Sequence, residues 1–185
     1  MSTLRERIAN ERRRLREVRQ KLSAAIEQGS GGDADWVPFY IAVADYMEAA
    51  MQRLHAQDVK MGDMIRDKLG ELDAAAEQAL RELDERLSGN EQRLRALLAA
   101  RDRLRSDGAA ALPDFEAAAR EFTAFIVANM GHHGATTDLA ARLFSPADWE
   151  YMAGISDEEL AREVALFERV TATTPPGLQP ASDAE

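Results

Sequence analysis

Apolar residues recur at intervals of three and four along four long stretches of the chain, which is the spacing of amphipathic helices. In the first stretch the repeating apolar positions are Leu4, Ile8, Leu15, Val18, Leu22 and Ala25. The predicted helices span residues 3–28, 36–69, 71–106 and 114–143, and the triplet at 88–90 is a candidate kink in the third. Alternating strand patterns are almost absent. The pattern therefore predicts an all-α fold, an up-down-up-down four-helix bundle.

Serine residues mark the starts of two further, short helices near the C-terminus. Ser145 precedes a proline, and Ser156 is followed three residues later by Glu159; both are signals for a helix start. Residues 171–185 are rich in Pro, Ser and Thr, a composition typical of disorder. We therefore expect one domain over residues 1–170 and a disordered tail over 171–185.

The composition narrows the classes of partner. The formal net charge is -10, with 33 acidic and 23 basic residues, which argues against a nucleic-acid backbone as the partner. The basic run ERRRLREVRQK has Glu partners at helical spacing and is interpreted as a solvated face. There is no cysteine, so disulfides and thiolate metal sites are excluded. No apolar run is long enough to span a membrane and no secretory signal is visible, so we expect a cytoplasmic protein.

Polar residues interrupt the apolar stripes at a few positions, and these residues are the candidates for a functional site. Glu11 interrupts the apolar stripe of the first helix. On the second helix Asp58 interrupts the stripe and His55 lies beside it. Asn90 interrupts the stripe of the third helix, and His133 that of the fourth. If consecutive helices run antiparallel, these side chains fall within a layer about 13 Å thick. We therefore expect them to lie close together in the core.

Carboxylates in such a layer need a compensating positive charge, because burying them unpaired costs several kcal/mol. No Lys or Arg falls on a stripe at this level, since Arg101 maps towards the other end of the bundle. A metal ion is the expected compensation: imidazole and carboxylate ligands suit iron, manganese or zinc. Two other interpretations stay open, namely a hydrogen-bonded structural histidine and carboxylates that reach water at the edge of the bundle.

Two short motifs resemble those of the hemerythrin-like (HHE cation-binding) family. The stretch HGATTD gives His133 and Asp138 the H-x-x-x-x-D spacing of the family's fourth helix, and HAQD provides His55 and Asp58 on the second. Glu11 stands where the family has a histidine on its first helix, and the third predicted helix has no histidine. The resemblance implies a four-helix bundle that holds non-haem iron, as a di-iron centre in that family. It also implies that the iron binds oxygen or a similar small molecule.

Glycines flank the histidine pair in the fourth predicted helix. Gly131 and Gly134 each lower helix propensity by about 1 kcal/mol relative to Ala. They would ease a local distortion that helps Asp138 reach a metal shared with His133, because five residues along an ideal helix place Asp138 about 140° round the axis.

The expected function is metal-dependent binding or sensing of a small molecule such as oxygen. The expected metal ligands are His133, His55, Asp58, Glu11 and Asp138, with iron as the metal and manganese or zinc as alternatives. An enzyme is less expected, because no nucleophile and base pair is recognisable. The alternative function is a metal-free helical adaptor that binds a protein partner or a second copy of itself. In that case Trp149, Tyr151 and Met152 are residue types favoured at interfaces.

Overall fold

The chain is all-α. The computed structural model describes residues 4–129 and 134–178, and this part contains no strand. Its helices are α1 (Leu4–Gln28), α2 (Val37–Leu69), α3 (Ala74–Asp107), α4 (Leu112–Asn129), α5 (Gly134–Leu143), α6 (Pro146–Met152) and α7 (Asp157–Thr173), with the short 3-10 helices η1 (Ala34–Trp36) and η2 (Gly108–Ala111). Within the described residues, no helix is both long and apolar enough to cross a bilayer.

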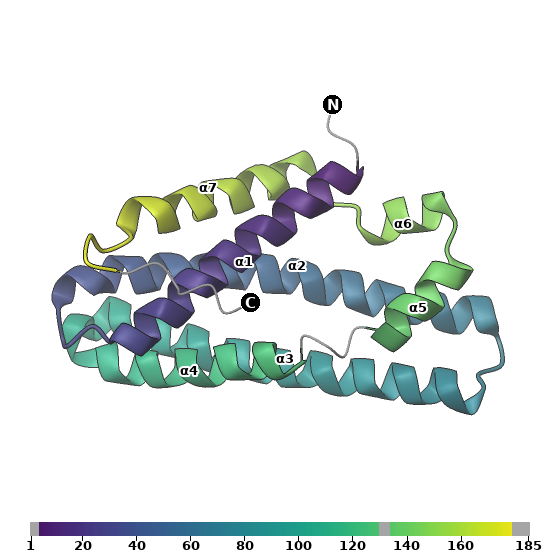
Figure 1. Cartoon of the computed structure of the whole chain (residues 1–185), viewed down its shortest axis with the longest axis horizontal. Coiled ribbons are helices and arrows are strands. Elements are labelled where there is room, and N and C mark those ends of the chain that lie inside the picture. The colour runs from purple at the N-terminus through teal and green to yellow at the C-terminus, as the bar shows by residue number, and fades with distance from the viewer. Residues whose placement is uncertain (1–3, 130–133, 179–185) are drawn as a thin grey trace.

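The two longest helices, α2 and α3, run antiparallel and carry the other elements (Figure 1). α4 packs along the C-terminal half of α3, whereas α1 crosses α2 obliquely. α7 runs along the opposite side of α2 from α3. The tight connections follow from local chemistry: Gly70 and Gly108 end α2 and α3 with positive φ values of 66° and 59°, which favour glycine.

Helix α3 is continuous, so the kink predicted at residues 88–90 is wrong. Gly89 has a different role, because a Cβ atom at this position would collide with the ring of Phe125 on α4. The guanidinium of Arg93, one turn further along α3, lies 4.0 Å from the centroid of that ring. Gly89 therefore allows α4 to approach α3 closely, and it does not bend α3.

The C-terminal third differs most from the sequence prediction. The single helix predicted over residues 114–143 is wrong, because α4 ends at Asn129 and α5 begins at Gly134 along another direction (Figure 1). The two serine caps are confirmed, each as a complete capping box at Ser145 and Ser156. However, the second of these helices is not short: α7 has 17 residues and packs against α2. Residues 171–178 also belong to the folded body, contrary to the predicted tail, since Leu178 packs against the core.

The hydrophobic core consists of two separate clusters. The larger cluster lies where α1, α2, α3 and α4 meet, with Val170 of α7, and its largest fully buried members are Phe39, Tyr40, Tyr46, Phe115 and Phe122. The smaller cluster lies where α2 and α3 meet α5 and α6, and it contains Met61, Ile65, Leu80, Leu83, Leu87, Ala140, Phe144, Met152 and Ala153. The central segment of α2 lies between the two clusters, and Leu54 in this segment belongs to neither of them.

Candidate functional site

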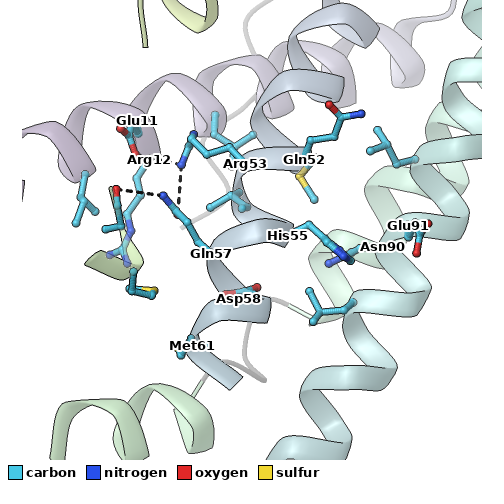
Figure 2. Close-up of a pocket in the computed structure, with 18 of the residues that line it drawn as sticks. Glu11, Arg12, Gln52, Arg53, His55, Gln57, Asp58, Met61, Asn90 and Glu91 are labelled. Atoms are coloured by element: carbon cyan, nitrogen blue, oxygen red, sulfur yellow. Dashed lines mark hydrogen bonds and ion pairs between the residues drawn. The ribbon is translucent and has the colours of Figure 1, made fainter. Parts of the chain in front are cut away.

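A cavity of about 930 Å³ lies between α1, α2 and α3, and residues of α5 and α6 close one of its ends. We call it the central cavity. Its apolar wall residues include Leu15, Met51, Leu54, Leu87, Leu94 and Leu98. Figure 2 shows its polar side chains, with Glu11 on α1, His55 extending from α2 towards α3, and Asn90 and Glu91 on α3.

The central cavity occupies the gap between the two core clusters. Met51 and Leu94 belong to the larger cluster, Met61 and Leu87 belong to the smaller one, and all four line the cavity. Leu54 lines the cavity as well, but it belongs to neither cluster. Ligand pockets have volumes of about 300–1,000 Å³, and the central cavity falls within this range. The gap thus has the size and lining of a binding site.

A buried ion-pair cluster joins α1, α2 and α7 beside the cavity. The Nε and Nη2 atoms of Arg53 donate to the two carboxylate oxygens of Glu163 over 2.7 and 3.1 Å, and Nη1 lies 3.1 Å from Oε2 of Glu11. Glu11 and Glu163 are only 4% and 2% exposed. Gln57 extends the cluster, because it accepts from Arg53 and donates to the carbonyl of Ala153 (Figure 2).

The two carboxylates of this cluster share one arginine, and the pKa of Glu11 reflects this. Burial raises the pKa of Glu11 above its ordinary value, the nearby positive charge of Arg53 lowers it, and the negative charge of Glu163 raises it again. The Oε1 atom of Glu11 has no hydrogen-bond partner among the described residues. Glu11 is therefore held by Arg53 through one carboxylate oxygen, and its other oxygen has no donor among the described residues.

The prediction that no arginine compensates the carboxylates at this level is wrong. Arg53 pairs with Glu11, and the buried Arg86 lies 3.4 Å from Asp58. Both arginines were missed because they lie beside the apolar stripes, and an arginine can reach several ångströms sideways from its helix. Arg101 does lie further along α3, where it pairs with Asp45 of α2.

The structure brings part of the predicted site together. Glu11, His55 and Asp58 line the central cavity, as does Asn90, whereas Asp138 is exposed on α5. His133 lies outside the described residues. Within the described ranges, no three His, Cys, Asp or Glu side chains are grouped closely enough to hold a metal ion. Because the predicted site depends on His133, metal binding stays a prediction.

The segment proposed as an adaptor surface mostly faces inwards. Trp149 and Met152 line the central cavity and pack in the smaller core cluster. Of the three interface-type residues only Tyr151 is well exposed, at 63%. The sequence allowed two interpretations of this segment, a partner surface or the closure of one end of the bundle, and the inward side chains favour the second.

We compared the chain with protein-family models, with curated proteins and with solved structures. No family model, no curated protein and no solved structure matches it. The resemblance to the hemerythrin-like family therefore rests on the residues alone, and the function has to be argued from the geometry of the central cavity.

Proposed function

We propose that this protein is a binding protein whose central cavity holds an elongated and largely apolar small molecule. The observation that carries the proposal is the volume of about 930 Å³ that separates the two core clusters. An apolar molecule bound along this wall would be removed from water together with the apolar side chains that it covers, which is favourable. The apolar wall and the few polar groups match the usual composition of ligand pockets.

The frame of this site supports the proposal. We interpret α1 to α4 as an up-down-up-down bundle whose fourth helix is short: α4 has 18 residues against 33 in α2 and 34 in α3. No described residue of α4 lines the central cavity. Among the described residues, the cavity wall thus comes from three of the four bundle helices, with α5 and α6 at one end.

A large side chain inside the cavity should block binding. We expect Leu54→Trp to weaken the binding of a neutral fluorescent probe, Nile red, at least about tenfold, a loss of about 1.4 kcal/mol. Leu54 is the residue to change because it lines the cavity and belongs to neither core cluster, so the indole has room. Fluorescence titration of the probe measures the affinity, and displacement by dodecanol shows that the site accepts an elongated molecule.

The matched control is Val59→Trp, since Val59 is an exposed residue of the same helix that does not line the cavity. This variant should bind the probe like the unmodified protein. Equal affinities for both tryptophan variants, or no saturable binding by the unmodified protein, would show that the cavity is not a binding site.

Metal binding is the second candidate function, because His55 and Asp58 line the same cavity from one side of α2. We expect protein without an affinity tag to retain iron, manganese or zinc after loading and desalting, and His55→Ala to retain less. A bound metal should also raise the melting temperature by about 5–11 °C at a hundredfold excess over its Kd. Elemental analysis and thermal melts measure both effects. Retention of less than a tenth of an equivalent for all three metals would exclude this candidate.

A further inference from the structure

The two ends of the central cavity differ in chemical character. At one end its walls come from the smaller core cluster, with Ile8 of α1, Met61 of α2 and Trp149 and Met152 of α6. At the other end the apolar wall residues belong to the larger cluster, and arginines stand beside them: Arg16 follows Leu15 on α1. A molecule lying along the cavity would therefore have one apolar end and one end among cations.

The cavity carries an excess of positive charge although the chain as a whole is acidic. Among the described residues, five arginines line it, against three carboxylates. Each of the carboxylates has an arginine partner: Glu11 pairs with Arg53, Asp58 with Arg86 and Glu91 with Arg95. The net charge of the chain is -10, so this concentration of positive charge in one cavity is local and unlike the rest of the protein.

Arg12 and Arg16 supply the unpaired cations of the cavity wall, Arg12 one helical turn beyond Ile8 and Arg16 two turns beyond it. They lie four residues apart on α1, both line the cavity, and both are exposed. Neither has an ion-pair partner among the described residues. The sequence predicted Glu partners at helical spacing within this basic run, and Lys21 does pair with Glu17, but in the described part of the chain no such pair holds Arg12 or Arg16. The two guanidinium groups at the cavity are therefore available for an anion.

We propose that the ligand of the central cavity is an anionic amphiphile. Its apolar chain lies towards α6, and its carboxylate or similar anionic group is bound by Arg12 and Arg16. This inference rests on the proposed binding function and names the class of ligand. A guanidinium binds carboxylates through two parallel hydrogen bonds, so a pair of arginines discriminates an anionic head from a neutral or cationic one. From Ile8 to Arg16 the rise along α1 is about 12 Å, which a medium-length alkyl chain can span.

Three amphiphiles with the same chain test the proposal: dodecanoate, dodecanol and dodecyltrimethylammonium, each below its micelle-forming concentration. Displacement of Nile red measures their affinities. We expect dodecanoate to bind at least about tenfold more tightly than dodecanol. Dodecyltrimethylammonium should bind most weakly of the three. In the double variant Arg12→Gln/Arg16→Gln the preference for dodecanoate should fall to less than about twofold, while dodecanol keeps its affinity.

The control is Arg13→Gln, because Arg13 is an exposed neighbour on α1 that does not line the cavity. It should keep the full preference for dodecanoate. Equal binding of the three amphiphiles, or a preference that survives the double variant, would overturn the anionic ligand and leave the binding function intact. Failure of all three compounds and of the probe to bind would overturn both.

Discussion

Replacing Arg53 with leucine should lower the free energy of unfolding by about 3–5 kcal/mol near neutral pH, because two buried carboxylates would lose their shared cation. Glu11 of α1 and Glu163 of α7 are almost fully buried, and among the described residues Arg53 is the cation within ion-pair distance of both. For a chain of this size the loss corresponds to a fall in melting temperature of about 6–20 °C. Thermal and urea unfolding followed by circular dichroism measure it.

The loss should depend on pH in a defined direction. The pKa of Glu11 is raised in the folded protein, chiefly by burial, so the folded state binds a proton here more readily than the unfolded state. Glu11 therefore costs stability as the pH rises through its raised pKa, and the cost disappears as the pH falls below the ordinary carboxyl pKa. Arg53 lowers the pKa of Glu11, so its removal widens this window. The difference between Arg53→Leu and the unmodified protein should thus shrink on acidification.

Two further variants control this prediction. Adding Glu11→Gln to Arg53→Leu should restore part of the lost stability, because one of the two uncompensated carboxylates is gone. Glu11→Gln alone should be close to neutral at neutral pH, since Arg53 keeps both of its hydrogen bonds to Glu163. A loss below about 1 kcal/mol for Arg53→Leu, or one that is the same at acidic and neutral pH, would mean that water compensates the cluster.

Replacing Tyr40 with alanine should cost about 3–5 kcal/mol for a different reason, the loss of a buried aromatic ring. Tyr40 is fully buried, and its ring centroid lies 4.8 Å from that of Phe115 and 5.9 Å from that of Trp36. Its hydroxyl donates to Glu116 over 2.9 Å, and the same Glu116 oxygen accepts from the backbone N–H of Ser30. Glu116 therefore joins both Tyr40 of α2 and the loop between α1 and α2 to α4, and the Tyr40 hydroxyl is one of its two donors. Urea unfolding gives the free energy.

Tyr40→Phe separates the ring from the hydroxyl. It keeps the packing with Phe115 and should cost only about 1–3 kcal/mol, because Glu116 loses one donor. Tyr40 does not line the central cavity, so folded Tyr40→Phe should bind Nile red like the unmodified protein. Equal losses for the two substitutions would show that the hydrogen bond, and not the ring, stabilises this region.

Local signals in the sequence predicted the helices well. The first three predicted helices agree with α1, α2 and α3 to within about three residues, the usual uncertainty of helix ends. The helix start at Ser145 and the capping box at Ser156 were also recognised correctly. These features depend on residues close together in the chain, and such signals can be read without knowledge of tertiary structure.

Features that depend on distant residues were missed. The site argument assumed that only residues on an apolar stripe reach the core, but Arg53 lies beside the stripe and is buried because α7 brings Glu163 to it. The central cavity was missed for a related reason. Leu54 follows the helical spacing as well as Val43 or Met47 does, yet it belongs to neither core cluster. Periodicity shows which side of a helix faces inwards, but it does not show whether anything packs there.

The division of the core into two clusters also affects how cooperatively the protein unfolds. The ends of α2 and α3 near residue 70, together with α5 and α6, are stabilised by the smaller cluster, which the cavity separates from the larger one. Parts of a protein that share few packed contacts can open at different free energies, and the smaller part opens first. A ligand lying across the cavity would touch both clusters and couple their opening. Binding would then convert two partly independent folding units into one, so that slower hydrogen exchange in α5 and α6 would report occupancy from outside the site.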